Sequence, residues 1–138
     1  MSEKKYPFNN SDSEWKENLS ELEYHVLRNK GTEAPYKGTY TDFIDAGFYY
    51  CKGCDVQLFS SEQKFQSSCG WPSFDNELES ANIEQIQDNS MGMRRTEIVC
   101  GNCGSHLGHI FDDGPTATGQ RYCVNSISLV HKKIKLNY

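Results

Sequence analysis

Two short cysteine motifs, CKGC at residues 51–54 and CGNC at residues 100–103, set the architecture of this 138-residue chain. Each closes a run of β-branched and aromatic residues, GFYYC (47–51) and RRTEIVC (94–100), so each is expected at the end of a strand. A CxxC turn brings two sulfurs into one tight loop, and two such turns supply the four soft ligands of tetrahedral Zn²⁺. Glycine and asparagine in these turns are expected to adopt positive φ. The pattern predicts one structural zinc ion per chain, bound by Cys51, Cys54, Cys100 and Cys103.

Other uses of these cysteines remain open at this point. Thioredoxin-like redox dithiols also carry CxxC, but they lie where a strand meets a helix, and no helical pattern follows either motif. A cluster of Cys100, Cys103, His106 and His109 would also offer four ligands, although it leaves the first motif without a role. Iron accepts four thiolates as zinc does, so the ligand set does not choose between the two metals.

The beginning of the chain has a helical pattern. Residues 1–12 are expected to form a flexible tail, and residues 13–138 a single domain. Capping boxes that begin at Ser11 and Ser20 favour two short helices over one long helix, and Gly31 ends the pattern. One apolar stripe at helical spacing runs through both: Trp15, Leu19, Leu22 and Val26.

The remainder of the chain has a β-rich pattern. Short aromatic and β-branched segments are separated by Gly, Asn, Asp and Pro, and four of them are expected to be strands: GFYYC (47–51), RRTEIVC (94–100), RYCVNSISLV (121–130) and HKKIKLNY (131–138). The polar segment 75–93 is expected to be a long loop with at most a helical turn. The predicted class is mainly β, an antiparallel core with short N-terminal helices, and its apolar interior is expected to rest on aromatic side chains.

Charge and hydropathy exclude several classes of function. The net charge is −5, and the acidic residues concentrate in the first 90 positions, which argues against general binding to nucleic acid or to an anionic membrane. Neither a secretory h-region nor a window of eighteen apolar residues occurs. A soluble cytoplasmic protein is expected. In such a reducing compartment cysteines serve metal binding or thiol chemistry before structural disulfides.

Two cysteines, Cys69 and Cys123, stand outside the CxxC motifs. On a strand, alternate residues share a face, so Arg121 and Asn125 point the same way as Cys123. A guanidinium beside a thiol favours the nucleophilic thiolate, and an amide offers an uncharged donor to a polar substrate atom. The alternative is that Cys123 is a small inert core residue, Arg121 a solvated charge and Asn125 a turn or edge residue.

Two further segments carry candidate pocket residues. In HLGHIFDDG (106–114), His106 and His109 are candidates to protonate an oxygen or to anchor a polar ligand, and the Asp pair there either builds a turn or orients a histidine. In CGWPSF (69–74), Pro72 stiffens the backbone beside Trp71, so the indole is a candidate wall against a methyl or thioether group. The alternative is that Trp71 belongs to the core.

These stretches resemble a known family, the methionine-R-sulfoxide reductases of the B type. The resemblance rests on KFQSSCGWPSF (64–74), RRTEIVCGNCGSHLGHIFDDGP (94–115) and GQRYCVNSISL (119–129), and an N-terminal arm of the family resembles residues 13–40. It implies a β-tent of two antiparallel sheets with N-terminal helices. It further implies reduction of the R epimer of methionine sulfoxide, in proteins or peptides in preference to the free amino acid.

The resemblance also implies a role for individual residues. Cys123 becomes the nucleophile, Cys69 the resolving cysteine, and the four CxxC cysteines the zinc ligands. Thioredoxin is then the expected reductant of a Cys69–Cys123 disulfide, and the protein is expected to be a monomer. The methyl group of the substrate is expected on Trp71. The rest of the pocket is assigned to His106, His109, Asn125, Arg121, Asp113 and Phe111.

Two rival functions belong to other classes. A zinc-clipped β module that only binds a protein partner would need no activated thiol, so Cys123 would react slowly with an alkylating probe. A thiol peroxidase would also pass through a sulfenic acid, but it would consume peroxide and leave methionine sulfoxide unchanged.

Overall fold

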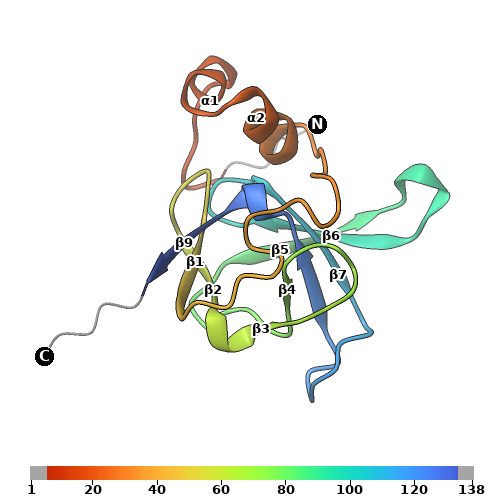
Figure 1. Cartoon of the computed structure of the whole chain (residues 1–138). Helices are drawn as coiled ribbons and strands as arrows, with labels where there is room; N and C mark the ends of the chain where they lie inside the picture. Colours follow the sequence, from red (N-terminus) through yellow and green to blue (C-terminus); the bar gives the residue numbers. More distant parts are fainter. Residues whose placement is uncertain (1–5, 134–138) are drawn as a thin grey trace, which may run out of the picture.

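Two antiparallel sheets and a pair of helices make up the part of the chain that the computed structural model describes, residues 6–133 (Figure 1). The helices are α1 (Asp12–Asn18) and α2 (Glu21–Arg28). The small sheet has the order β2-β1-β9, with β1 at Gly47–Cys51, β2 at Gln57–Ser60 and β9 at Leu129–Lys133. The large sheet has the order β3-β4-β8-β7-β6-β5. Its strands are β3 (Lys64–Phe65), β4 (Ser73–Phe74), β5 (Ile83–Asp88), β6 (Arg95–Cys100), β7 (His106–Phe111) and β8 (Arg121–Val124). This architecture confirms the expected mainly β fold.

Both predicted helices form, and each begins with its capping box. The side chains of Ser11 and Ser20 accept hydrogen bonds from the backbone N–H groups of Glu14 and Glu23, three residues later. The carboxylates of these glutamates in turn accept from the backbone N–H groups of the two serines. Trp15 and Val26 are buried, as the stripe required, but Leu22 is 54% exposed. The break at Ser20 resets the direction in which side chains point, so one stripe drawn through both helices was wrong at Leu22.

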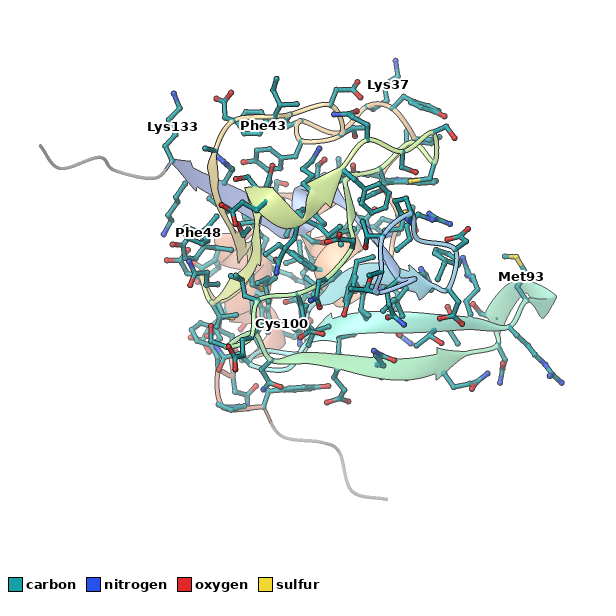
Figure 2. The ribbon with its side chains drawn as sticks, turned by 90° about the horizontal axis from the view of Figure 1, so that it is seen from below. Lys37, Phe43, Phe48, Met93, Cys100 and Lys133 are labelled. Atoms are coloured by element: carbon teal, nitrogen blue, oxygen red, sulfur yellow. The ribbon has the colours of Figure 1, made fainter. Side chains whose placement is uncertain are left out.

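The helices lie together at one end of the molecule, above the ends of the strands, and β5 and β6 project as a long hairpin (Figure 1). Met93 lies near the tip of this hairpin and Cys100 at its inner end (Figure 2). The expected loop at 75–93 therefore contains a strand, β5, which pairs along its whole length with β6. The alternation of apolar and polar residues along β5 is weak, because this edge strand is only partly buried.

The segment RYCVNSISLV is not one strand. β8 ends at Val124, a 3₁₀ turn η3 occupies Ser126–Ser128, and β9 begins at Leu129 in the other sheet. Because the chain changes sheets here, the residues after Cys123 connect the two layers. The predicted strand at 131–138 is confirmed as far as Lys133, and its remainder, residues 134–138, lies outside the described residues. Residues 1–5 also lie outside them, so the flexible tail and the domain limits stay predictions.

The core between the two sheets is aromatic, as expected. Phe59 and Phe74 stack with ring centroids 4.2 Å apart, and Tyr49 and Tyr122 meet this pair edge-on at 5.1 and 5.6 Å. These four rings come from both sheets, and Tyr122 neighbours Cys123 on β8. Burial of such large rings dominates core energetics, so the strand that carries Cys123 is firmly held. Within residues 6–133, no helix has the length and apolar character needed to cross a membrane.

Candidate active site and metal centre

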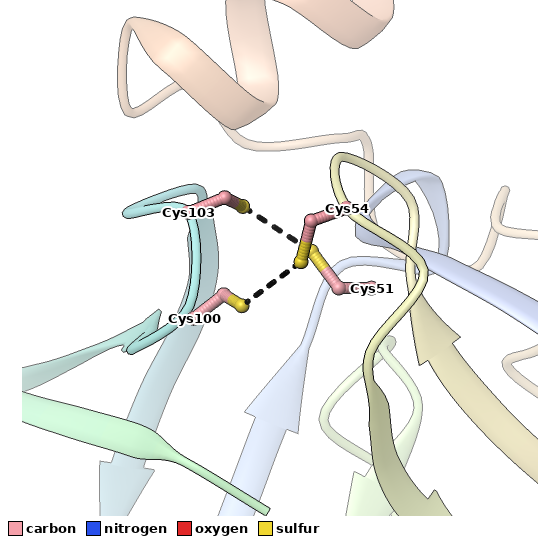
Figure 3. A group of neighbouring side chains, drawn as sticks. All are labelled: Cys51, Cys54, Cys100 and Cys103. Carbon is pink, nitrogen blue, oxygen red and sulfur yellow. Dashed lines mark hydrogen bonds between the residues drawn. The ribbon is translucent and has the colours of Figure 1, made fainter. Parts of the chain in front are cut away.

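The four CxxC cysteines converge into one cluster (Figure 3). Their sulfur atoms all lie within 4.8 Å of one another, and two pairs, Cys51 with Cys103 and Cys54 with Cys100, are 3.6 Å apart. A tetrahedral ion with metal–sulfur bonds of about 2.3 Å would place its ligands about 3.8 Å apart. The donor set and its spacing therefore fit one closed metal site. The histidine-containing alternative does not form, because His106 and His109 bind carboxylates instead.

The two turns that carry these cysteines have the same backbone structure. The N–H after the second cysteine donates to the carbonyl of the first, from Asp55 to Cys51 at 2.8 Å and from Gly104 to Cys100 at 2.7 Å. Asp55 and Gly104 have φ of 66° and 78°. Positive φ thus falls on the residue directly after each motif, which confirms the expectation for Gly104, whereas Gly53, Gly101 and Asn102 within the motifs do not adopt it. Two matching turns from different sheets present their sulfurs symmetrically.

Helix α2 is fastened to the second turn. The Arg28 guanidinium donates to the carbonyl of Cys103 at 3.0 Å and to the hydroxyl of Ser105 at 3.3 Å, and it lies 4.3 Å from the centroid of the Trp15 ring. The Sγ of Cys103 itself lies 3.1 Å from the Ser105 hydroxyl. The cysteine cluster and its turns therefore join three parts of the fold, namely both sheets and the helical arm.

The two remaining cysteines meet elsewhere, with Cys69 Sγ 3.6 Å from Cys123 Sγ. Sheet register produces this contact, because Cys123 on β8 pairs with Ser73 on β4 and with His109 on β7. The chain before Ser73 turns back through Gly70 at φ 96°, which leaves Cys69 Sγ 3.3 Å from the Ser73 hydroxyl. Neither thiol is sealed in the core, since both are half-buried.

Each thiol changes the acidity of the other. Hydrogen bonding with Cys69 raises the pKa of the Cys123 thiol, and the same contact lowers the pKa of Cys69 to about 4. Arg121 lowers the pKa of Cys123, as the sequence suggested, but by less than Cys69 raises it. The two thiols therefore titrate as one coupled pair, in which loss of a proton from one opposes loss of a proton from the other.

Arg121 is largely neutralised by another residue. Its guanidinium donates two hydrogen bonds to the Asp113 carboxylate, at 2.8 and 3.2 Å, and stacks 4.4 Å from the centroid of the Phe111 ring. This pairing raises the pKa of Arg121 and lowers the pKa of Asp113. Asp113 and Arg121 therefore form a charged pair beside Phe111, and Arg121 acts on Cys123 through its charge and a hydrogen bond.

A small cavity of about 100 Å³ opens beside Cys123. That volume holds the end of one side chain, since a water takes about 30 Å³. Five of its lining residues come from the predicted set: Cys123, Trp71, His109, Phe111 and Asn125. The cavity continues toward a second one of about 360 Å³, with which it shares Thr32, Arg95 and His109. Cys123 thus faces a polar and aromatic space, with the indole of Trp71 as one wall.

His106 and His109 lie on β7, three residues apart. On a regular strand this spacing would send them to opposite faces, but a bulge between β6 and β7 places their rings 5.7 Å apart. The Nε2 atom of His109 lies 2.8 Å from an Asp88 oxygen, and burial lowers the pKa of His109. The Nδ1 atom of His106 lies 2.6 Å from a Glu97 oxygen, outside the small cavity. His109 is therefore the histidine that a bound ligand would meet.

Asn125 is held on three sides. Its backbone N–H and its amide nitrogen both donate to the carbonyl of Leu107, at 2.9 and 3.2 Å, and its amide oxygen accepts from the N–H of Glu33 at 3.1 Å. A carboxamide has two N–H bonds, so one remains to be offered to a ligand in the cavity. Asn125 follows β8 and caps η3, yet it still lines the same cavity as Cys123.

Several site residues escaped the sequence interpretation. Thr32, Arg95 and Gly108 line the cavity beside Cys123. Asp88 lies in the segment that was expected to be a loop, and Glu97 in the middle of a strand that was examined only for its cysteine. A conspicuous buried-strand glutamate in RRTEIVC was the one available signal, because a carboxylate amid β-branched residues needs a partner.

Comparison with known proteins agrees with this geometry. Residues 19–133 match the SelR domain. A peptide methionine sulfoxide reductase MsrB from Alteromonas mediterranea is 52% identical over 122 residues, which cover 88% of this chain and 86% of that protein. Proteins of the same name from Methanosarcina mazei and Leptospira interrogans are 51% and 47% identical, covering 86% and 93% of this chain and 85% and 98% of the relatives. The chain therefore belongs to the SelR-domain family of MsrB peptide methionine sulfoxide reductases.

Proposed function

We propose that this protein reduces the R epimer of methionine sulfoxide in oxidised proteins and peptides back to methionine. Family membership supports the reaction, and the observation that carries its assignment to this site is the pair of thiols 3.6 Å apart beside a cavity walled by Trp71. The cavity beside Cys123 has room for the end of a side chain, which suits a substrate that projects from a polypeptide. The choice of the R epimer rests on the resemblance of the motifs.

In the first step the sulfur of Cys123 attacks the sulfoxide sulfur. Cys123 passes its proton to Cys69, 3.6 Å away, as the substrate binds, and the substrate methyl group packs on the Trp71 indole. The free N–H of Asn125 donates to the sulfoxide oxygen, and the His109 ring, whose orientation Asp88 fixes, passes a proton from solvent to that oxygen. Transfer of the oxygen to Cys123 releases methionine and leaves a sulfenic acid, so methionine sulfoxide is reduced by two electrons and Cys123 is oxidised by two.

In the second step Cys69 attacks the sulfenic acid of Cys123. Water leaves, and a Cys69–Cys123 disulfide forms. The proton of Cys69 leaves with the sulfenic hydroxyl group in that water molecule, so the step needs no further acid or base. An external dithiol of the thioredoxin type then reduces the disulfide and restores both thiols.

The remaining four cysteines hold a structural metal ion, which we propose to be zinc. The sulfurs of the Cys₄ cluster fill every position of a tetrahedral ion, so the ion stabilises the scaffold and leaves no open coordination position for a substrate. We further propose that the protein acts as a monomer in the cytoplasm, without nucleic acid or membrane as a partner. Six cysteines suit such a reducing compartment, and the net charge of −5 is unsuited to polyanions.

The decisive experiment uses peptides that carry separated R and S sulfoxides. With dithiothreitol as reductant, the wild-type protein should reduce the R peptide, and Cys123→Ser should reduce neither. Cys69→Ser should still release about one methionine per protein molecule, but it should fail to turn over with thioredoxin. Reduction of the S peptide alone would overturn the assignment, and consumption of peroxide without reduction of either peptide would favour a thiol peroxidase.

A further inference from the structure

The N-terminal arm reaches the cavity through a buried carboxylate residue, Glu33. Glu33 is 6% exposed and lies in the connection between α2 and β1. Its neighbour Thr32 lines both the small cavity beside Cys123 and a larger cavity of about 570 Å³, and Glu33 lines the larger one. The segment therefore borders the thiol site.

The backbone of Glu33 holds two walls of the thiol site at once. Its N–H donates to the Asn125 amide oxygen at 3.1 Å, and its carbonyl accepts from the Trp71 indole N–H at 3.0 Å. The first bond turns the amide nitrogen of Asn125 away from Glu33, and the second fixes the plane of the indole. A shift of this one residue would misplace both side chains together.

The side chain of Glu33 fixes the position of that backbone. One carboxylate oxygen accepts from the N–H of Ile127 in η3 at 2.8 Å. The other oxygen is buried and has no hydrogen-bond partner among the described residues, so the bond to Ile127 is the one hydrogen bond that the carboxylate makes within them. Gly38 lies against it, because a Cβ there would be 2.2 Å from the carboxylate oxygen and 2.2 Å from the Ser126 hydroxyl oxygen. The carboxylate thus occupies a slot made by η3 and a glycine.

We propose that Glu33 is a positioning residue, which couples η3 to the thiol site by holding Trp71 and Asn125 in the geometry that the substrate requires. Its carboxylate accepts a hydrogen bond from η3, and its backbone N–H and carbonyl bond the Asn125 amide and the Trp71 indole. Gly38 has no side chain that would occupy the space of the carboxylate. This inference rests on the proposed function for its kinetic part. Its structural part, the placement of Trp71, can be measured without any substrate.

The test compares three variants at this slot. Glu33→Ala removes the bond to Ile127, whereas Glu33→Gln keeps an oxygen acceptor for Ile127. Gly38→Ala places a methyl group against the Glu33 carboxylate and should displace it, although Gly38 does not itself line the thiol site. Each is made in a Trp15→Phe background, so that the emission and acrylamide quenching of Trp71 can be read alone. Trp15 suits this replacement because its indole N–H is buried without a partner among the described residues. Loss of an interaction that is equally strong in the substrate complex and in the transition state raises KM, whereas loss of an interaction with the sulfoxide oxygen in the transition state lowers kcat.

Glu33→Ala and Gly38→Ala should each shift the emission of Trp71 and increase its quenching. With sulfoxide peptide they should raise KM about fivefold or more, which corresponds to one buried hydrogen bond. Glu33→Gln should stay near wild type in both measurements. Glu77→Ala is the control, because Glu77 also accepts one hydrogen bond, at 3.0 Å from Tyr122, but lies away from the indole. It should lower the melting temperature and leave Trp71 unchanged.

Native emission and quenching of Trp71 in Glu33→Ala would overturn the proposal. Should Glu33→Ala fail to fold, native Trp71 signals in Gly38→Ala would overturn it equally. A third outcome separates the two proposals: a wild-type protein that leaves sulfoxide peptides unchanged contradicts the proposed function, while the fluorescence of the variants still decides the role of Glu33.

Discussion

The Cys₄ cluster and the Cys69–Cys123 pair contain the same sulfur contact in two different surroundings. In both, the nearest sulfur atoms are 3.6 Å apart. The cluster adds two further sulfurs to each contact, and three of its four cysteines are fully buried. The pair instead opens on a cavity lined by an indole, an imidazole and an amide. Distance between thiols therefore does not identify their chemistry, whereas the groups around them do.

The two regions also differ in how the fold produces them. The cluster depends on local turns that repeat the same backbone hydrogen bonds at two places in the chain. The pair depends on sheet register, since Cys123 stands opposite Ser73, and the turn at Gly70 brings Cys69 back over it. A local turn motif can be recognised in the sequence, but a contact that depends on strand register can be predicted only when the pairing of the whole sheet is known. The same contrast predicts that the two sets of cysteines respond differently to replacement.

The largest effect is expected from breaking the cluster. Cys100→Ser removes one of four ligands, so the metal should be lost and the free energy of unfolding should fall by at least about 5 kcal/mol, given that structural zinc sites contribute about 10 kcal/mol or more. Chelation of the metal from the wild-type protein should have a similar effect. Metal content by mass spectrometry and urea unfolding monitored by circular dichroism measure both.

The matched replacement in the pair is Cys123→Ser. It should leave the metal content and the unfolding midpoint near wild type while it abolishes turnover, because a half-buried thiol at a cavity contributes little to the fold. If Cys123→Ser unfolded the protein as Cys100→Ser does, or if Cys100→Ser kept its metal, the division into structural and reactive sulfurs would be wrong.

A smaller loss of stability is expected at Glu97, which lies on the strand that ends in Cys100. Glu97 is 1% exposed, accepts from His106 and pairs with Lys30 at 3.2 Å. Burial alone would raise its pKa, but His106 and Lys30 outweigh burial, so the pKa of Glu97 lies below its ordinary value of 4.5. Glu97→Gln should therefore lower the free energy of unfolding by about 2 kcal/mol at pH 7.

The pH dependence of this loss has a definite sign. A carboxyl group whose pKa is depressed by folding stabilises the protein above its unfolded pKa, and the stabilisation disappears as the pH falls through the folded value. The difference between wild type and Glu97→Gln should thus be full at pH 7 and should shrink below about pH 4.5. Urea titrations at several pH values measure it, and a constant difference down to pH 3 would contradict the ionised role of Glu97.

Much of the scaffold was predictable because it is encoded locally. The capping boxes at Ser11 and Ser20 located both helices, and each CxxC motif located the end of a strand. The strand β5 was missed because an edge strand with polar faces lacks a clear alternation. The break after Cys123 was missed because NSIS has β-branched and small residues that suit a strand as well as a 3₁₀ turn.

The candidate site was only partly predictable for a related reason. Cys123, Trp71, His109 and Asn125 lie in compact motifs, and they do meet at one cavity. Arg95 reaches the cavity from a hairpin whose position depends on tertiary packing, and Asp88 and Glu33 act on it through hydrogen bonds with residues that line it. The protonation of the thiols also could not be inferred from the neighbouring Arg121, because the contact with Cys69, 54 residues away, has the larger effect.

The effect of each thiol on the pKa of the other can be tested by replacing Cys69 and Cys123 in turn. Cys69→Ala removes the contact that raises the pKa of Cys123 and leaves the lowering effect of Arg121. The pKa of Cys123 should fall, and its alkylation rate at pH 7 should rise about tenfold for each pKa unit. Conversely, Cys123→Ala should raise the pKa of Cys69 from about 4 toward the ordinary thiol range. Thiolate absorbance at 240 nm against pH measures both, and an unchanged Cys123 in Cys69→Ala would show that the thiols do not titrate as a coupled pair.

The smallest effect is expected from Asp113→Asn. This change frees the Arg121 guanidinium from its carboxylate, so the uncompensated charge should favour the Cys123 thiolate. Because the Asp113 side chain is exposed to solvent, alkylation of Cys123 should rise only a few-fold at low salt, and the gain should vanish near 1 M salt. Asp55→Asn breaks a comparable surface pair, with Lys132 at 2.9 Å, beside the Cys₄ cluster and should leave Cys123 unaffected. A slower Cys123 in Asp113→Asn would mean that Asp113 acts by holding Arg121 in place, and not by neutralising it.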